Sequence, residues 1–327
     1  MINLALKFIK CTLNKALIYL KGMILAIFAE KKNKTERMKK NILFVCLLLS
    51  FSATQAQLLW KVSGNGLKHP SYLFGTHHLI PIQFLDSVPG LYKAFNASNV
   101  VIGEMLTSNV DATAKIQQAA IMPKHIKMRD LLSEKEYELV DKELKSTLKI
   151  GLKEFSMMNP TLINTLYEME IYKKLTGFTE DVQTDSYFQL VAAEQDKKVI
   201  GLETVEEQIS ILFGNASLQR QAEVLVETMK QKDSALVELV HMNKLYKAGK
   251  IDELVQLSKG KNKKSDMTLE EYAKLVDNRN TDWLTKLPPL FQESSCFVAV
   301  GALHLGGQNG LVKLLQKKGY KVTAVTD

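Results

Sequence analysis

The chain has 327 residues, of which 46% are hydrophobic and 24% are charged. This balance is typical of a globular protein and excludes a fibrous repeat or a largely disordered chain. The net charge of +8 arises within residues 1–56, where ten basic residues face two acidic ones, so residues 57–327 are formally neutral. The basic excess therefore gives no support for nucleic-acid binding by the part expected to fold.

Residues 38–56 have the pattern of a bacterial secretory signal peptide. A lysine-rich start is followed by an apolar run, residues 41–53, that is too short for a comfortable membrane span. Thr54 and Ala56 then form a small-x-small cleavage pattern. We expect cleavage before Gln57 and a secreted or periplasmic protein whose mature part spans no membrane.

Residues 1–37 are apolar but contain many lysines. We interpret them as the product of an upstream start codon, in preference to a membrane-associated helix. Cys46 lies inside the apolar run and not after it, which argues against a lipoprotein. Cys296 is the only cysteine downstream of residue 56, so the mature chain has no internal disulfide, and the apolar run 296–300 suggests a buried thiol without chemistry.

Beyond the leader, short apolar runs alternate with turns and long helical stretches. Strands are predicted at residues 58–62, 71–74, 99–102, 198–202, 297–300 and 320–325, the first two as a hairpin. Helices are predicted within 131–176 and 217–259, from residue 205 onward, and over 311–318. We expect an α/β fold, with a central mixed sheet, flanking helices and a helical cap inserted between the sheet halves over about residues 131–260.

Two Gly-x-x-His turns follow predicted strands, one near each end of residues 57–327. Gly75 precedes His78 and Gly301 precedes His304. Because glycine tolerates a positive φ, we expect each turn to bend sharply and aim its imidazole across the edge of the sheet. Together with a carboxylate from a third strand end, such as Glu104, the two imidazoles would form a three-ligand divalent-metal site. The spacing alone leaves open that each histidine is only structural.

Six ordered blocks over almost all of residues 57–327 resemble the TraB/GumN family. The blocks are Ser71–His78, Val101–Glu104, Val199–Thr204 with Gln208, Arg279-Asn280 with Trp283, Val300–Leu311 and Gly319–Val322. The family is similar in its motifs to the animal TIKI proteases, in which two Gly-x-x-His motifs and a glutamate support a divalent-metal peptidase. The resemblance thus implies an α/β fold of the erythromycin-esterase-like, TIKI-like kind.

Carried over residue by residue, the resemblance makes His78, His304 and Glu104 the metal ligands or catalytic groups. Glu203 and Arg279 match further polar positions of the family. Their implied roles are orientation of the histidines or, for Arg279, a clamp on a substrate carboxylate. A salt bridge within the cap is the alternative for Arg279.

Asp185 falls where family members often have an aspartate, and it has the same two interpretations: support of the histidines, or a salt bridge in the cap. His77 departs from the family pattern, since an apolar or small residue is more usual before the motif histidine. Adjacent residues of an extended strand point to opposite faces. We therefore expect His77 to orient the other site residues without binding the ion itself, or to lie exposed to solvent.

Two glycine- or lysine-rich loops receive no function. The basic loop over residues 259–264 is interpreted as a solvated turn between helices, not as a lipid or nucleic-acid patch. The glycine-rich loop after Val300 lacks the spacing of a phosphate-binding loop.

The sequence therefore predicts an exported metal-dependent hydrolase, a peptidase acting on peptides or proteins. Mn²⁺, Co²⁺ and Zn²⁺ all suit a His, His and carboxylate set. The alternative is a non-catalytic ligand-binding or signalling protein on the same fold. The sequence decides neither the substrate, the metal nor the oligomeric state.

Overall fold

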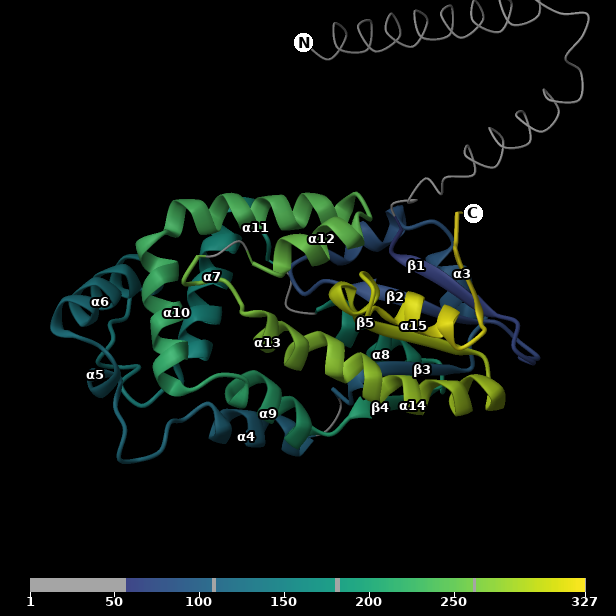
Figure 1. Cartoon of the computed structure of the whole chain (residues 1–327), viewed down its shortest axis with the longest axis horizontal. Helices are drawn as coiled ribbons and strands as arrows, with labels where there is room; N and C mark the ends of the chain where they lie inside the picture. Colours follow the sequence, from purple (N-terminus) through teal and green to yellow (C-terminus); the bar gives the residue numbers. More distant parts are fainter. Residues whose placement is uncertain (1–56, 108–109, 180–182, 261–262, 327) are drawn as a thin grey trace, which may run out of the picture. The chain divides into compact units, whose positions relative to one another are not determined.

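The computed structural model describes residues 57–107, 110–179, 183–260 and 263–326 (Figure 1). The predicted signal peptide and residues 1–37 lie outside these ranges. The described residues belong to one compact unit. In these ranges we find no helix with the length and apolar character needed to cross a membrane.

A six-stranded mixed sheet lies at the centre of this unit, in the order β4-β3-β5-β2-β1-β6. The strands are β1 (Leu59–Ser63), β2 (Ser71–Thr76), β3 (Val100–Met105), β4 (Lys198–Glu203), β5 (Cys296–Gly301) and β6 (Lys321–Ala324). Strands β2 to β5 run parallel, while β1 is antiparallel to both of its neighbours. The predicted hairpin and the other predicted strands are confirmed.

The central strands have the composition expected of a sheet covered on both faces. Every residue from Cys296 to Val300 in β5 is buried, as are Val100, Val101 and Ile102 in β3. Such near-continuous apolar runs are typical of parallel strands with helices on either side. Polar side chains can therefore reach solvent only where these strands end.

Helices account for most of the remaining described chain. They are α3 (Leu91–Asn96), α4 (Val110–Ala119), α5 (Met128–Leu131), α6 (Glu134–Leu148), α7 (Pro160–Thr176), α8 (Thr184–Glu194), α9 (Val205–Gly214), α10 (Leu218–Lys230), α11 (Lys232–Lys247), α12 (Ile251–Ser258), α13 (Leu269–Tyr272), α14 (Asn278–Glu293) and α15 (Leu311–Lys317). The helix starts carry local signals. The Asn159 side chain caps α7 by accepting from Thr161 N–H at 2.9 Å, and Thr204 and Glu207 form a capping box on α9.

The sheet is covered by helices on both faces (Figure 1). Helices α3 and α8 pack on one face, where the rings of Phe95 and Phe188 meet Phe297 at centroid distances of 5.4 and 4.9 Å. Helices α14 and α15 lie on the other face. This arrangement confirms the predicted α/β fold with a mixed sheet and flanking helices.

A second hydrophobic cluster lies away from the sheet, among helices α5, α6, α7 and α10. It includes Met128, Val140, Leu144, Ile163 and Leu225, all buried. The helices expected within 131–176 and 217–259 are thus present, and three of them, α6, α7 and α10, surround this core together with α5. The division of the chain into a domain with an inserted cap remains a prediction.

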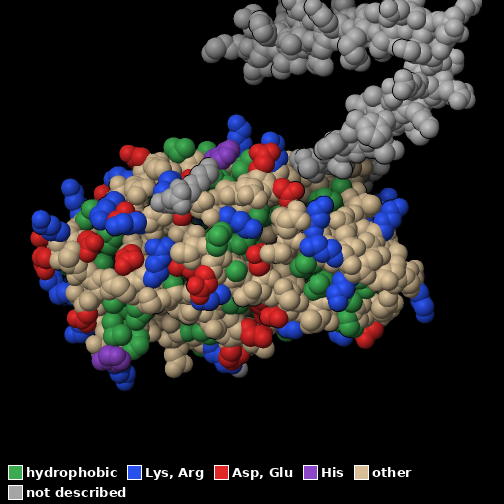
Figure 2. Space-filling view, viewed as in Figure 1, with side chains coloured by type: hydrophobic (Ala, Val, Ile, Leu, Met, Phe, Trp, Pro, Cys, Tyr) green, Lys and Arg blue, Asp and Glu red, His purple; other side chains and the backbone are tan. Residues whose placement is uncertain are grey.

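Figure 2 shows lysine and arginine side chains interspersed with aspartate and glutamate over the visible face of the described residues. This mixture agrees with the formal neutrality of residues 57–327.

Candidate functional site

Four parallel strands end at the same edge of the sheet, and each delivers a polar residue there. Glu104 is the penultimate residue of β3, and Glu203 is the last residue of β4. His78 lies two residues beyond the end of β2, and His304 ends the short 3-10 turn, Ala302–His304, that follows β5. The carboxyl edge of parallel strands is where α/β proteins commonly bind ligands.

The two Gly-x-x-His turns are neighbours, because β2 and β5 pair in parallel with Gly75 opposite Val300. The expected role of their glycines is wrong, however. Neither Gly75 nor Gly301 has a positive φ, and the φ of Gly301 is −51°. Gly75 is needed for space, since a Cβ there would lie 3.0 Å from the Cα of Ala302. The backbones of the two turns therefore lie in close contact at Gly75 and Ala302.

His304 is buried, with 4% of its surface exposed. Its Nδ1 lies 2.7 Å from Oδ1 of Asn280, and its ring packs on Trp283 at a centroid distance of 4.3 Å. Its Nε2 lies 3.0 Å from Nη1 of Arg279 and 3.8 Å from Oε1 of Glu104. Burial lowers the pKa of His304 to about 4, because the nearby Glu104 carboxylate only partly offsets the loss of solvation. The ring is therefore neutral at pH 7.

Glu104 is ionised at neutral pH. Its Oε1 accepts from the backbone N–H of Gly301 at 2.8 Å, and its Oε2 accepts from Nη2 of Arg279 at 2.5 Å. Burial alone would raise the pKa of Glu104, but the charge that His304 acquires in acid, the Arg279 guanidinium and the Gly301 N–H bond bring it down to about 2. A carboxylate with fixed donors is thus set beside a neutral imidazole.

Arg279 enters the site from α14 and is 7% exposed. Its guanidinium binds Glu203 through two bonds, Nε to Oε1 at 2.7 Å and Nη2 to Oε2 at 2.9 Å, in addition to its contacts with Glu104 and His304. Although burial opposes the charge of the guanidinium, the bonds to Glu203 and the two carboxylate charges raise the pKa of Arg279. One buried cation therefore joins two carboxylates, an arrangement that suits the fork of arginine and not the single ammonium of lysine.

Glu203 has two further donors, which sequence reasoning did not assign to the site. Trp283 donates from Nε1 to Oε1 at 2.9 Å, and Gln208 donates from Nε2 to Oε2 at 2.7 Å. Trp283 follows Arg279 by four residues in α14, so both side chains lie on one face of the helix and reach the same carboxylate. The four-residue spacing between Arg279 and Trp283 was the signal in the sequence that could have assigned Trp283 to the site.

His78 lies at the exposed rim of the site, with 61% of its side chain accessible. Its Nδ1 lies 3.6 Å from Oδ1 of Asp185, in the first turn of α8. Loss of solvation opposes a charge on His78, but the Asp185 carboxylate and the more distant Glu104 raise its pKa above the ordinary value. The structure thus pairs His78 with Asp185 and not with His304.

His77 is half-buried and turned away from the other site residues. Its ring packs on Tyr246 at a centroid distance of 5.0 Å, and its Nδ1 accepts from the backbone N–H of Leu79 at 3.0 Å. Its backbone also exchanges hydrogen bonds with the Thr184 hydroxyl. Burial and the positive charges of His78 and Lys247 lower the pKa of His77 to about 4. Its contacts fix the path of the chain on both sides of His78.

The donor types at this edge fit a divalent ion, and one pair of donors is in place. His304 Nε2 and Glu104 Oε1 face each other across 3.8 Å. Within the described residues, however, no group of three or more His, Cys, Asp and Glu side chains gathers closely enough to hold a metal ion. The third predicted ligand, His78, lies against Asp185, and the Arg279 guanidinium fills the space beside the donor pair.

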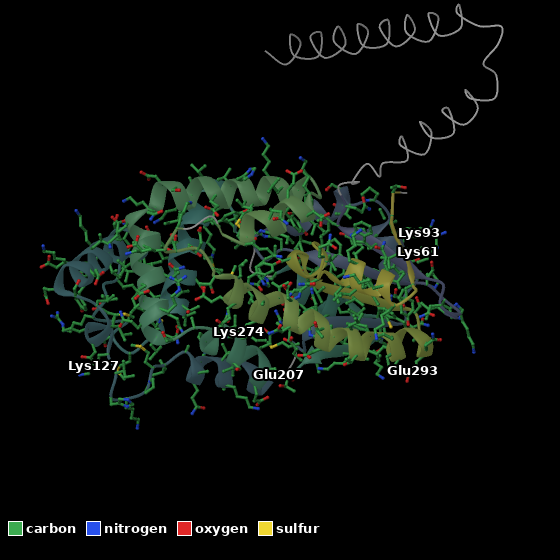
Figure 3. All side chains as sticks on the ribbon, viewed as in Figure 1. Lys61, Lys93, Lys127, Glu207, Lys274 and Glu293 are labelled. Atoms are coloured by element: carbon green, nitrogen blue, oxygen red, sulfur yellow. The ribbon has the colours of Figure 1, made fainter. Side chains whose placement is uncertain are left out.

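A cavity of about 420 Å³ borders the site between α9 and α14. Glu203, Arg279 and Trp283 contribute to its walls, as do Glu207 and Lys274, which are labelled in Figure 3. The arginine and carboxylate network is therefore reachable from a space large enough for part of a ligand.

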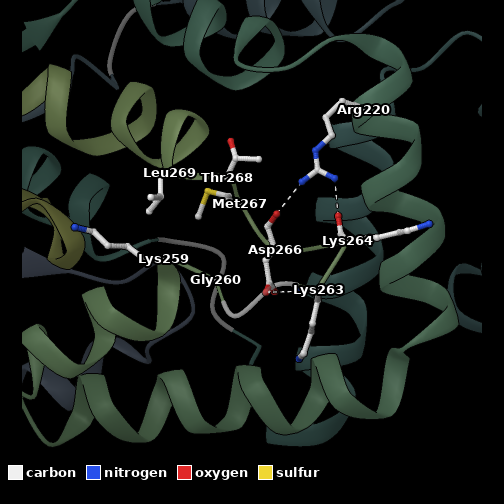
Figure 4. A pocket seen from close by; sticks show the side chains of 9 residues that line it. All are labelled: Arg220, Lys259, Gly260, Lys263, Lys264, Asp266, Met267, Thr268 and Leu269. Carbon is white, nitrogen blue, oxygen red and sulfur yellow. Dashed lines mark hydrogen bonds between the residues drawn. The ribbon is translucent and has the colours of Figure 1, made fainter.

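A separate cavity of about 520 Å³ is lined by the described residues of the basic segment, Lys259, Gly260, Lys263 and Lys264, together with Arg220 and residues 266–269 (Figure 4). Its Arg220 donates to Glu271 and to the carbonyl oxygens of Lys264 and Asp266. Lys263 is paired with Glu238 at 2.8 Å. Because these cations already have partners, we assign no ligand to this cavity.

Comparison with known proteins relates the chain to one family. The relative metalloprotease TIKI1 of Danio rerio is 24% identical, with the match covering 81% of this chain and 62% of that protein. The chain thus spans about three fifths of the length of this relative. No solved structure matches the chain significantly. The family model described as TraB/PrgY/gumN matches residues 58–324, and this shows that the chain belongs to the TraB/PrgY/gumN family.

Proposed function

We propose that this protein is a metal-dependent hydrolase that cleaves peptide bonds at the carboxyl edge of its sheet. The observation that carries the proposal is the pairing of a neutral, buried His304 with an ionised Glu104, their Nε2 and Oε1 atoms 3.8 Å apart. Metal sites require ligands that are deprotonated, and both groups meet this requirement at pH 7. The relationship to a metalloprotease supports the same reading.

His304, Glu104 and His78 would hold the ion. When bound, a divalent ion supplies Lewis acidity toward a peptide carbonyl and toward water. His78 is the exposed member of the set, so its side chain can turn from Asp185 without disturbing the core. Mn²⁺, Co²⁺ and Zn²⁺ remain the candidates, because each accepts nitrogen and oxygen donors.

Arg279 has two functions in this proposal. Its paired bonds to Glu203 hold the guanidinium at the site, while Nη1 and Nη2 reach His304 and Glu104. Release of the His304 contact would free Nη1 to donate to an oxygen of the substrate, where negative charge develops during acyl transfer. Glu203 serves as the fixed anchor for this movement.

A peptidase assay tests the proposal. The purified protein is incubated with a peptide library, with and without each candidate metal, and the products are identified by mass spectrometry. We expect metal-dependent cleavage that a chelator abolishes and that His78→Ala reduces at least a hundredfold. His241→Ala is the matched control, because this histidine lies exposed on α11. Cleavage that persists at the wild-type rate in His78→Ala would remove the basis of the proposal.

A second function, ligand binding without turnover, is favoured by one specific feature. Arg279 already bridges Glu104, Glu203 and His304, so the polar groups of the site are satisfied without an ion. A site of this kind could receive a carboxylate or carbonyl through the guanidinium alone. Saturable peptide binding with no cleavage under any metal condition supports this second function.

We further propose that the protein is exported, with its mature chain starting at Gln57. The described body has ordered contacts from that residue onward: the Gln57 N–H donates to Gly249 O at 2.7 Å, and 8% of the residue is exposed. Mass spectrometry of the protein recovered from the culture medium or periplasm tests this. We expect an N-terminus at Gln57, whereas recovery of residues 1–56 on the cell-associated protein alone would refute it.

A further inference from the structure

Asn280 is buried, with 0% of its surface exposed, and its amide is used at both ends. Its Nδ2 donates to His304 O at 3.1 Å and to Asn309 O at 2.8 Å. Its Oδ1 lies 2.7 Å from His304 Nδ1. Asn280 therefore holds both the imidazole of His304 and the glycine-rich loop that follows it.

These contacts fix which way the amide points. The two carbonyl oxygens can only accept, so the atom that faces them must be the NH₂ group. A reversed amide would place its oxygen against both carbonyls and lose two hydrogen bonds in a buried place, at a high cost in stability. Oδ1 of Asn280 is consequently the atom that faces His304.

The orientation of the amide in turn fixes the proton on His304. An amide oxygen accepts and never donates, so Nδ1 of His304 must carry a hydrogen. On the other side of the ring, Arg279 Nη1 lies 3.0 Å from Nε2, and a guanidinium only donates. Two independent neighbours therefore require the same tautomer, with hydrogen on Nδ1 and a lone pair on Nε2.

We propose that Asn280 is a positioning residue that holds His304 in the Nδ1–H tautomer, so that its Nε2 lone pair accepts from Arg279 beside Glu104. A histidine that binds a ligand atom through one nitrogen commonly has its tautomer set by a hydrogen bond at the other. Here the partner is an amide, which orients the ring without adding charge. The consequence for metal affinity rests on the proposed function, whereas the tautomer itself does not.

Nitrogen NMR of the ring tests the tautomer directly. The full chain, labelled with ¹⁵N-histidine, is measured at pH 7 without metal, and the His304 signals are assigned from their absence in His304→Gln. We expect a protonated Nδ1 and an unprotonated Nε2. A protonated Nε2 in the wild-type protein would overturn the proposal, whatever the variants show.

Two substitutions separate the functions of Asn280. Asn280→Asp keeps an oxygen acceptor for Nδ1–H but loses the NH₂ donor, so we expect the Nδ1–H tautomer to persist. Asn280→Ala removes both and leaves only the Arg279 contact to favour the Nδ1–H tautomer, so we expect a detectable population of the Nε2–H form. Asn159→Ala is the matched control, because Asn159 is also buried but only caps α7. Asn280→Ala with an unaltered tautomer would contradict the proposal.

Metal titration of the same proteins then distinguishes this inference from the proposed function. We expect Asn280→Ala to weaken Zn²⁺ or Mn²⁺ binding by roughly 10- to 100-fold, and Asn159→Ala to leave it unchanged. If the wild-type protein binds no metal but has the Nδ1–H tautomer, the metal hydrolase proposal fails and the function of Asn280 stands. If metal binds but Nε2 is protonated in the metal-free protein, the proposed function of Asn280 fails and the metal hydrolase proposal stands.

Discussion

Arg279 joins three side chains of the site through one guanidinium, and the energetics of the site depend on that connection. It is 7% exposed, and the Glu203 side chain that it binds is 6% exposed. A buried ion pair gains little over an apolar pair, but removing one partner leaves a charge without compensation. At the residue scale, we therefore expect the stability of the fold to depend on Arg279, in addition to the role proposed for it in the site.

Replacement of Arg279 tests this dependence. We expect Arg279→Gln to lower the free energy of unfolding by about 3–5 kcal/mol, because Glu203 and Glu104 lose their shared cation. Urea denaturation measures the change. Arg129→Gln serves as the control, since the Arg129 and Glu134 side chains are 61% and 68% exposed and their pair should contribute no more than about 1 kcal/mol. A small loss for both variants would show that the Arg279 network is loosely held.

Stability should also fall as the solution becomes acidic. His77 and His304 have pKa values lowered to about 4 in the folded protein, against 6.5 for the unfolded chain. The unfolded state therefore binds protons first, and the stability that comes from the neutral rings is lost as the pH falls from about 6.5 to 4. Glu104, with a folded pKa of about 2 against 4.5, adds a further loss below pH 4.5.

Denaturation across this range separates the histidines. Each of these two histidine rings should contribute a slope of up to about 1.4 kcal/mol per pH unit. We expect His77→Gln to have a smaller loss between pH 6.5 and 4.5 than the wild-type protein, whereas His241→Gln, on an exposed helix position, retains the full loss. Equal pH dependence in all three proteins would show that His77 is not held neutral by the fold.

At the scale of elements, the site depends on the close contact between the two turns that follow β2 and β5. The Tyr246 hydroxyl of α11 donates to Gly75 O at 2.8 Å, and Asp252 of α12 accepts from the Gly307 N–H at 2.8 Å. The two consecutive helices thus hold the first Gly-x-x-His turn and the glycine-rich loop that follows the second. The helices on the long connection between β4 and β5 are in this way part of the construction of the site.

Gly75→Ala tests the close approach. Its Cβ would lie 3.0 Å from Ala302 Cα and 3.2 Å from Ala302 Cβ, so backbone must shift. We expect a loss of about 1–3 kcal/mol in the free energy of unfolding, measured in urea. Gly214→Ala is the control, because its Cβ would meet only Ser210 Oγ at 3.6 Å and alanine favours the helix. Equal stability of Gly75→Ala and the wild-type protein would contradict the packing described.

At the scale of the whole molecule, the strands and helices could be predicted from the sequence, but the order of the strands in the sheet could not. Apolar runs such as 297–300 indicated strands because both faces of these strands are covered. Nothing local indicated that β5 would lie between β3 and β2, and this order is what brings His304 beside Glu104. The glycine of the first turn was identified correctly but for the wrong reason, since its contact with Ala302 is long-range.

The same limit applies to the polar network. Arg279, Glu203 and Asp185 were recognised as polar positions, but their partners lie on other elements, so the ion pair with two carboxylates was not foreseen. Asn280 and Gln208 were part of the matching blocks without a function. Their hydrogen bonds to His304 and Glu203 follow only from the packing of α14 and α9 against the strand ends.

A calorimetric titration with Mn²⁺, Co²⁺ and Zn²⁺ tests most directly whether the edge of the sheet is a metal site. The wild-type protein is compared with Glu104→Gln and His78→Ala, with His241→Ala as the control. We predict saturable binding of one ion per chain in the wild-type and His241→Ala proteins, and at least a hundredfold weaker binding in the other two. The absence of binding to the wild-type protein, or equal binding by all four, would contradict the account.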